Sequence, residues 1–314
     1  MVCLAVRAGG HQGFLEWRRL FADLDPGLRV VDWADPALDP ATVDFALVWD
    51  PEPGRLARMS NLRAILSAAA GVDHITRDPH WPRDVPLIRM GGEETAVQMG
   101  DYVLWAVFSL LRDARTLAIG QQNATWRRAA CAVRMSSDVT VGVMGLGNLG
   151  AHVARRLAGA GLRVAGWARS PRQMPGIACH AGPEELPAFL RSCDILVCLL
   201  PDTPQTRNCV NADMLSHLRR PAGLVNVGRG TLIVDGDVLR ALDDGTLFGA
   251  VLDVFRDEPL PPASPFWSHP RVTVTPHVAA EASRSARARY VAAIIQAILK
   301  GEEVPLRYQP DRSY

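Results

Sequence analysis

The stretch DVTVGVMGLGNLG, residues 138–150, decides the fold of this chain. An apolar run at residues 139–144 leads directly into a glycine-rich turn, and apolar residues at helical spacing follow over residues 152–157. A second apolar run at residues 163–167 completes the unit. This order predicts two parallel strands joined by a crossover helix, which is how a dinucleotide-binding fold begins.

The glycines of the turn stand where such a fold needs them. Gly145 permits the tight turn, Gly147 lets the backbone approach a pyrophosphate, and Gly150 lets the helix pack closely on the strand. Together with Asn148 and Leu149 they open the helix, whose first N–H groups can bind an anion. Glycine turns also occur without a ligand. Because this turn lies between a strand and a helix, we predict dinucleotide binding.

Length and composition indicate an ordinary globular protein with two domains. The chain has 314 residues, 48% of them apolar and 21% charged, and a net charge of +1. The near-neutral charge favours neither a nucleic acid nor a membrane as partner, and no apolar run reaches the roughly 18 residues of a membrane span. Because the N-terminus also lacks the pattern of a signal peptide, we expect a cytoplasmic protein.

The cysteines and the lysine argue against several kinds of site. The cysteines show neither CxxC spacing nor a cluster with histidine, so we expect reduced thiols and no metal site. They are Cys3, Cys131, Cys179, Cys193, Cys198 and Cys209. Lys300 is the only lysine and follows a long helical pattern. Its place argues against pyridoxal-phosphate chemistry and against phosphoryl transfer on a P-loop.

Short apolar runs alternate with helical patterns along the chain. The expected strands are residues 3–6, 29–32, 46–49, 63–67, 87–89, 139–144, 163–167, 195–199, 223–227, 249–253 and 272–275. The expected helices include residues 14–24, 56–61, 95–115, 183–191, 212–218, 235–242 and 279–300. We therefore predict an α/β protein with two doubly wound parallel sheets. We expect a Rossmann-type dinucleotide-binding domain, residues 99–281, to be inserted into a flavodoxin-like substrate domain, residues 1–98 and 282–314.

A run of small residues follows the strand expected at residues 63–67. It reads AAAG at residues 68–71. Small side chains leave the backbone N–H groups accessible, as an anion-binding turn requires. The alternative is a tight connection without a ligand, and these residues taken alone favour that alternative.

Three strands in the second half of the chain each end next to one ionisable residue. Arg229 lies between two glycines, where its guanidinium can bind a carboxylate through two parallel hydrogen bonds. Glu258 follows the next strand and His277 the last. A histidine whose other ring nitrogen is held by a carboxylate is a suitable proton donor near neutral pH. These three residues are therefore our candidates for the reduction of a carbonyl group.

The motifs of the chain, in their order, resemble those of the D-2-hydroxyacid dehydrogenase family over nearly the whole length. They are SAAAGVDHI at residues 67–75, GLGNLG at 145–150, LPDTPQT at 200–206, NVGRG at 226–230, LDVFRDEPLP at 252–261 and TPHVAA at 275–280. Four further stretches resemble the glyoxylate/hydroxypyruvate reductase branch of the family. They are ALVW at residues 46–49, WARSP at 167–171, HVAA at 277–280 and DRSY at 311–314. The resemblance implies an NAD(P)-dependent oxidoreductase that reduces a small 2-oxo acid to the D-2-hydroxy acid.

The resemblance also implies roles for individual residues. Arg229 binds and polarises the 2-oxo acid, His277 gives a proton to its carbonyl oxygen, and Glu258 hydrogen-bonds to His277. In the substrate domain, the resemblance implies that the backbone amides of Ala70 and Gly71 bind the substrate carboxylate. It also implies that Trp49 lines the substrate pocket. The implied cofactor contacts beyond the glycine turn include Leu200, Pro201, Val227 and Asp253, the last to the nicotinamide carboxamide.

The second strand of the dinucleotide unit ends in WARSPR, residues 167–172, which contains no carboxylate. An NAD-specific site needs an acidic residue about 20 positions beyond the glycines to bind the ribose 2′-hydroxyl, and Ala168 stands there instead. Arg169 and Ser170, with Arg172, are suited to bind a 2′-phosphate. We predict NADPH in preference to NADH.

Two stretches depart from the family pattern. Asp202 replaces a commonly apolar or small residue beside the cofactor, and GGEE at residues 91–94 is an unusual loop. Neither removes a catalytic group. Two alternatives remain open, namely a dehydrogenase of the same family with a different substrate, and a non-catalytic protein that senses a dinucleotide. The resemblance further implies a homodimer built around residues 95–115.

Overall fold

The computed structural model describes residues 1–130 and 134–310, and the chain divides into two compact units. Unit 1 comprises Met1–Glu94 and Ala282–Tyr314, and unit 2 comprises Thr95–Glu281. The domain boundary expected at residue 98 lies inside helix α3 (Glu93–Leu111). Cys131 and the DRSY ending at residues 311–314 lie outside the described residues.

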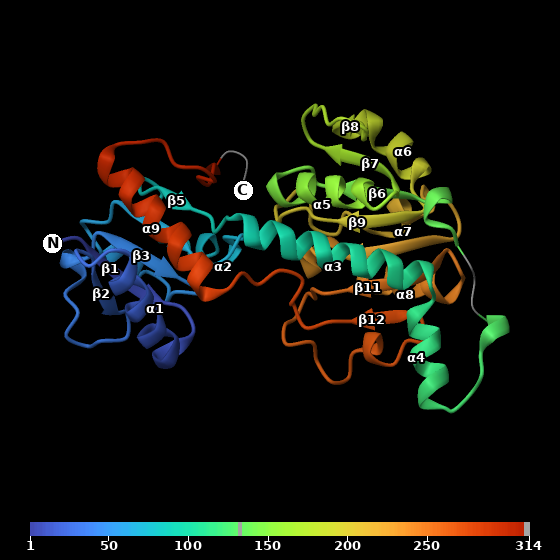
Figure 1. Ribbon diagram of the computed structural model, residues 1–314, viewed down its shortest axis with the longest axis horizontal. Helices are drawn as coiled ribbons and strands as arrows, with labels where there is room; N and C mark the ends of the chain where they lie inside the picture. The colour runs from blue at the N-terminus through green and yellow to red at the C-terminus, as the bar shows by residue number, and fades with distance from the viewer. Residues whose placement is uncertain (131–133, 311–314) are drawn as a thin grey trace. The chain divides into compact units, whose positions relative to one another are not determined.

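Unit 1 is built on a parallel sheet of five strands in the order β2-β1-β3-β4-β5 (Figure 1). The strands are β1 (Cys3–Arg7), β2 (Arg29–Asp32), β3 (Phe45–Val48), β4 (Ala64–Ser67) and β5 (Leu87–Ile88). Its helices are α1 (Gly10–Leu24), α2 (Asp73–Thr76) and α9 (Arg284–Lys300). Successive strand residues point to opposite faces, so Leu4 and Leu47 pack with α1 and α9 on one face, and Ala46 and Val48 pack with Trp33 on the other.

Unit 2 is built on a parallel sheet of seven strands in the order β12-β11-β10-β9-β6-β7-β8 (Figure 1). The strands are β6 (Thr140–Met144), β7 (Arg163–Ala168), β8 (Ala178–Ala181), β9 (Ile195–Cys198), β10 (Ala222–Asn226), β11 (Leu247–Leu252) and β12 (Val272–Val274). The helices besides α3 are α4 (Ala114–Gln122), α5 (Asn148–Gly159), α6 (Gly182–Ser192), α7 (Ala212–Ser216) and α8 (Asp235–Asp243). Apolar residues of α3 and α5 pack on one face of the sheet, and those of α6, α7 and α8 pack on the other.

The predicted fold class, two doubly wound parallel sheets, is confirmed. Strand β8 has no counterpart among the expected strands, because it is a short edge strand without fully buried residues. The helix expected at residues 56–61 is only the 3₁₀ turn η2 (Leu56–Arg58). The single helix expected at residues 95–115 is interrupted at Asp113, whose backbone is left-handed with φ 48°.

The last helix begins later than its apolar pattern indicates. Residues 279–283 are not helical, and α9 starts at Arg284 because the side chain of Ser283 accepts a hydrogen bond from the N–H of Ala286. Across the described ranges, we find no helix with both the length and the apolar character needed to span a membrane.

Candidate active site

The register of the unit 2 sheet brings the ends of five neighbouring strands to one edge. The last residues of these strands lie side by side in the order Met144, Cys198, Asn226, Leu252 and Val274. Because the strands are parallel, the segments that follow them leave the sheet at the same edge. Ligands bind at this edge in open α/β sheets. The glycine turn, Arg229, Glu258 and His277 all follow these strand ends.

The glycine turn between β6 and α5 fits the pyrophosphate of a dinucleotide. Gly145 has a φ of 114°, and a Cβ on Gly150 would lie 1.8 Å from the carbonyl oxygen of Gly145. A Cβ on Gly147, in contrast, would meet no described atom within 4 Å. Helix α5 begins at Asn148 with neither a side-chain cap nor an acidic residue in its first turn. Its N–H groups and the positive end of its dipole are thus suited to an anion.

The segment after β7 carries positive charge and no carboxylate. Ala168 is the buried last residue of the strand, and Arg169, Ser170 and Arg172 are exposed. An exposed guanidinium and hydroxyl can both donate hydrogen bonds to a phosphate. The residues expected to select the cofactor are therefore accessible in unit 2.

The structure pairs His277 with Glu258. His277 Nδ1 lies 2.7 Å from Glu258 Oε2, and the other carboxylate oxygen accepts a hydrogen bond of 2.8 Å from the N–H of Phe255. The hydrogen bond to Glu258 raises the pKa of His277, although burial of the imidazole opposes this. Burial acts against ionisation of Glu258, but the hydrogen bonds from His277 and Phe255 outweigh it, so the pKa of Glu258 is lowered. Both shifts favour the protonated imidazole next to a carboxylate.

Arg229 lies within electrostatic range of this pair. Its positive charge lowers the pKa values of both Glu258 and His277, in each case as a smaller contribution than their mutual hydrogen bond. The loop is fixed by Asn226, whose side chain donates to the carbonyl of Arg229 and accepts from the N–H of Gly228. The sequence-predicted group of Arg229, Glu258 and His277 is thus brought together in unit 2.

Asp253 holds the turn on which His277 lies. Its carboxylate accepts hydrogen bonds of 2.6 Å from Thr275 Oγ1 and of 2.9 Å from the N–H groups of Val278 and Ala279. Its backbone carbonyl accepts from the N–H of His277 at 2.8 Å. The side chain of Asp253 is thus a structural anchor, in addition to the nicotinamide contact that the resemblance implies for it.

Tyr102 is a part of this arrangement that sequence reasoning missed. Its hydroxyl lies 2.5 Å from Thr275 Oγ1, which in turn donates to Asp253. Tyr102 lies on α3, 173 positions before Thr275, so no local pattern could have indicated the contact. The helix that the sequence marks only by its apolar spacing therefore also supports the turn of His277.

The expected substrate contacts of unit 1 lie at the ends of β3 and β4. Trp49 follows β3 and is 47% exposed, and its ring centroid lies 4.2 Å from that of His74. Ala70 and Gly71, both half-buried, follow β4. These two strands are neighbours in register, so Trp49 and the small-residue run are at the same edge of the unit 1 sheet.

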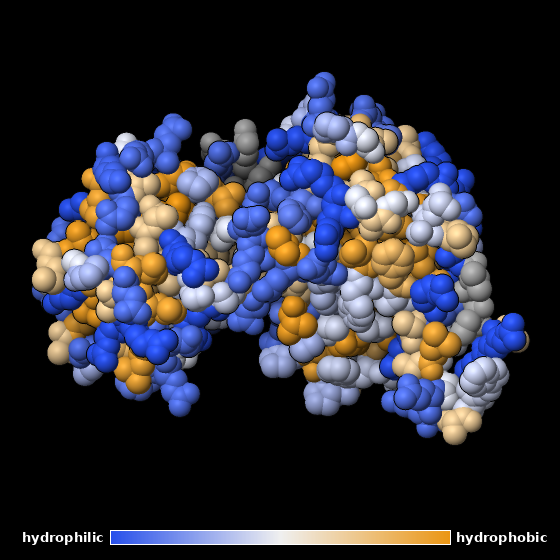
Figure 2. All heavy atoms as spheres, in the orientation of Figure 1, coloured by the Kyte–Doolittle hydropathy of each residue, from blue (hydrophilic) through white to orange (hydrophobic). Residues whose placement is uncertain are grey.

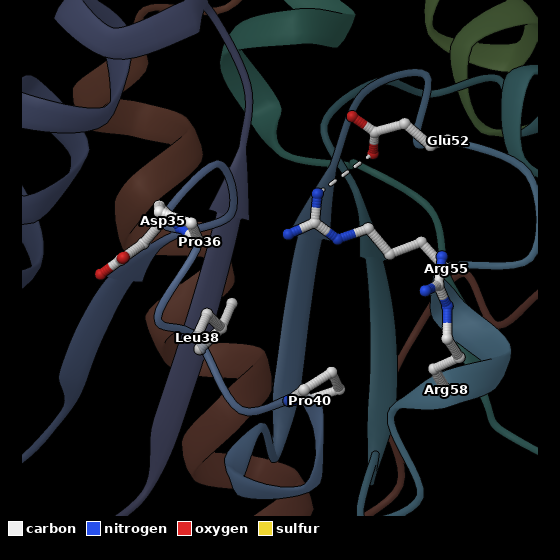
Figure 3. Close-up of a pocket in the computed structure, with 7 residues that line it drawn as sticks. All are labelled: Asp35, Pro36, Leu38, Pro40, Glu52, Arg55 and Arg58. Carbon is white, nitrogen blue, oxygen red and sulfur yellow. Dashed lines mark ion pairs between the residues drawn. The ribbon is translucent and has the colours of Figure 1, made fainter.

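A pocket of about 330 Å³ in unit 1 is separate from these residues. Figure 3 shows its lining, in which Arg55 points toward Glu52. Arg55 also donates to the carbonyl of Trp33, and Glu52 accepts from the indole of Trp33 and pairs with Arg7. None of the sequence-predicted site residues lines this pocket, and the charges of Arg55 and Glu52 are paired within unit 1.

Comparison with known proteins identifies the family. Residues 104–279 match the family model for the D-isomer specific 2-hydroxyacid dehydrogenase, NAD binding domain. The chain is 38% identical to the glyoxylate/hydroxypyruvate reductase A of Yersinia enterocolitica serotype O:8 / biotype 1B over 283 residues, 88% of this chain and 89% of that protein.

Solved structures are similar over the whole chain. The D-isomer specific 2-hydroxyacid dehydrogenase from Xanthobacter autotrophicus Py2, in complex with NADPH and MES, has a TM-score of 0.93 at 36% identity, with 100% of this chain and 99% of that chain covered. The NADPH-dependent glyoxylate/hydroxypyruvate reductase from Sinorhizobium meliloti, in complex with NADP and sulfate, has a TM-score of 0.91 at 36% identity, with both chains covered completely. This chain therefore belongs to the D-isomer specific 2-hydroxyacid dehydrogenase family, and it is an oxidoreductase.

Proposed function

We propose that this protein reduces a small 2-oxo acid of the glyoxylate or hydroxypyruvate type to the D-2-hydroxy acid, with NADPH as reductant and His277 as proton donor. The observation that carries the proposal is the 2.7 Å contact between His277 Nδ1 and Glu258 Oε2, with the charge of Arg229 acting on both groups. The names of the relatives support the substrate class.

The residues divide the chemistry between them. A nicotinamide cofactor, held through its pyrophosphate by the glycine turn of residues 145–150, would supply the hydride that reduces C2 of the substrate. Because Glu258 occupies Nδ1 of His277, Nε2 is the ring nitrogen left to give a proton to the carbonyl oxygen. The guanidinium of Arg229 polarises that carbonyl, and the N–H groups of Ala70 and Gly71 bind the carboxylate. His277 then recovers its proton from water.

The direct test of the proposed function is steady-state oxidation of NADPH with a panel of 2-oxo acids that includes glyoxylate and hydroxypyruvate. Turnover with either of these supports the proposal, and turnover only with other 2-oxo acids would assign a different substrate within the family. Tight binding of NADPH without turnover of any member of the panel would contradict the proposal and favour a dinucleotide-sensing protein.

Replacement of Glu258 by glutamine is expected to shift the pH dependence of kcat/KM. The amide still accepts a hydrogen bond from His277 but carries no charge, so the pKa of His277 falls. A proton donor is active below its pKa. The loss of activity at high pH therefore begins at a lower pH in Glu258→Gln than in the wild type. The measurement is a pH profile for both proteins.

The matched control is Asp257→Asn, which removes the adjacent exposed carboxylate. It should leave the profile unchanged. An unchanged profile in Glu258→Gln as well would contradict the pairing of Glu258 with His277 in the working enzyme.

Replacement of Arg169 by alanine tests the preference for NADPH. Loss of one charged donor to a phosphate is expected to raise KM for NADPH by about tenfold and KM for NADH by less than about twofold. Steady-state kinetics with both cofactors measure this. Arg163→Ala, which changes an exposed arginine at the opposite end of β7, is the control. Equal changes for the two cofactors would remove Arg169 from the phosphate site.

We also propose that the protein forms a homodimer through α3, α4 and the segment after α4. Large apolar side chains are exposed there, among them Trp105 at 46%, Leu117 at 50% and Trp126 at 92%. Figure 2 shows apolar residues among polar ones on the surface of α4. Exposed apolar side chains in one region are typical of an interface. Light scattering after size exclusion tests this, since Trp126→Ser with Leu117→Ser should give a monomer; a monomeric wild type would contradict it.

The cytoplasm remains our proposed location. Cys3, Cys179, Cys193, Cys198 and Cys209 are free thiols, which is typical of a reducing compartment. Fractionation of cells with detection of this chain tests the location, and recovery outside the cytoplasm would contradict it.

A further inference from the structure

The loop after β4 presents two backbone N–H groups that make no hydrogen bond within the described part of the chain. They belong to Ala70 and Gly71. The N–H groups before them are bound, that of Ala68 to the carbonyl of Val48 at 2.9 Å and that of Ala69 to Ser67 Oγ at 3.1 Å. The carbonyl groups of Ala69, Ala70 and Gly71, in contrast, each accept a hydrogen bond from within unit 1.

Ser67 holds the loop from one side. The side chain is 1% exposed. Its hydroxyl oxygen lies 2.8 Å from the carbonyl oxygen of Ala69 and 3.0 Å from that of Gly71, and it accepts the hydrogen bond from the N–H of Ala69. His74 Nε2 lies 3.5 Å away. One buried hydroxyl thus connects both ends of the loop.

Arg89 holds the loop from the other side. Its Nε donates a hydrogen bond of 2.9 Å to the carbonyl oxygen of Ala70. The next residue, Met90, donates its N–H to the carbonyl of Ala69 at 3.0 Å. Arg89 is itself fixed, because its N–H donates to the carbonyl of Leu306 at 3.1 Å. The strand end at β5 is therefore a rigid support for the loop.

Because the peptide bond is planar, a hydrogen bond that fixes a carbonyl group also fixes the direction of the N–H group of the next residue. In a trans peptide the carbonyl of one residue and the N–H of the next point in opposite directions. Fixing the carbonyl of Ala69 therefore directs the N–H of Ala70 away from Ser67 and Met90. Fixing the carbonyl of Ala70 directs the N–H of Gly71 away from Arg89. Two N–H groups fixed in this way form a site for an anion.

We propose that Ser67 and Arg89 are positioning residues that hold the Ala70 and Gly71 N–H groups ready for the substrate carboxylate. This inference rests on the proposed function, in which these N–H groups bind that carboxylate. It explains why a buried serine and an arginine flank a run of small residues. This role differs from simple electrostatic attraction of the substrate, because it depends on the hydrogen bond from Arg89 Nε to Ala70 and not on charge alone.

The test compares Ser67→Ala and Arg89→Met with the wild type. Loss of one positioning hydrogen bond is expected to raise KM for glyoxylate about tenfold, with kcat and KM for NADPH within about twofold of the wild type. Matched controls are Ser60→Ala and Arg19→Met, which change exposed residues of unit 1. Thermal melts followed by circular dichroism establish that each variant is folded.

A third variant distinguishes position from charge. Arg89→Lys keeps the charge but lacks the Nε–H group that donates to Ala70, so KM for glyoxylate should stay raised. A wild-type KM in Arg89→Lys would assign Arg89 a purely electrostatic role and overturn its part of the proposal. A wild-type KM in both Ser67→Ala and Arg89→Met would overturn the whole.

Calorimetric titration with oxalate, in the presence of NADPH, gives a readout that does not need turnover. Ser67→Ala and Arg89→Met should each bind oxalate about tenfold more weakly than the wild type. If the wild type binds oxalate but reduces no 2-oxo acid, the proposed function fails while the weaker binding by the variants still supports the loop. Equal affinity in all three proteins, or no binding by the wild type, would overturn the positioning role.

Discussion

Replacing His277 by alanine is expected to lower kcat by about 10²–10⁴-fold, the range typical of a lost general acid. The imidazole of His277 is held by a carboxylate, with Nδ1 2.7 Å from Glu258 Oε2. Binding of NADPH should be retained, because the glycine turn and the segment after β7 are separate from His277. The measurement is kcat with glyoxylate together with the dissociation constant for NADPH.

The backbone at His277 calls for a second variant. Its φ is 57°, a left-handed conformation that asparagine adopts more readily than alanine. His277→Asn therefore removes the proton donor with less backbone strain, and it should show the same loss of kcat as His277→Ala. His269→Ala is the control, since His269 lies 3.3 Å from Asp243 in a second histidine–carboxylate pair. Near-normal turnover in His277→Asn would show that the proton comes from another group.

Replacing Arg229 by alanine is expected to lower kcat/KM for the 2-oxo acid by about 10²-fold or more, the loss typical for removal of one donor to a developing oxyanion. Arg229→Lys should recover only part of this, because an ammonium group cannot form two parallel hydrogen bonds. KM for NADPH should change by less than about twofold. Arg191→Ala, at an exposed position of α6, is the control.

Arg229→Ala is also expected to change the pH dependence of activity. The charge of Arg229 lowers the pKa of His277, so its removal raises that pKa. The high-pH loss of activity should therefore move to higher pH in Arg229→Ala, opposite to the shift expected for Glu258→Gln. A shift in the same direction for both variants would contradict the electrostatic arrangement of the three groups.

The sequence predicted those parts of the fold that depend on local patterns. Central strands such as β9 and β10 are buried along their whole length, so each appears as a continuous apolar run. The edge strand β8 is only partly buried and leaves no such run. Asp113 interrupts a helical pattern through its own backbone conformation, which apolar spacing does not reveal.

The candidate site divides in the same way. The glycine turn was recognisable because its function depends on backbone conformation within six residues. The three ionisable residues were recognisable because each lies in the segment that follows a strand. The contacts of Tyr102 with Thr275 and of Arg89 with Ala70 were not, because a hydroxyl or a guanidinium can bond to any nearby acceptor and the sequence does not give its neighbours.

The sequence by itself determined the family, the two parallel sheets and the strand ends that carry Arg229, Glu258 and His277. Local periodicity and ordered motifs encode these features. Only the tertiary structure decided that Glu258 bonds to Nδ1 of His277, that Asp253 anchors the turn of His277, and that the loop after β4 is held by its carbonyl groups. The reason is physical. Such contacts join groups from separate elements, and their distances are set by how the elements pack.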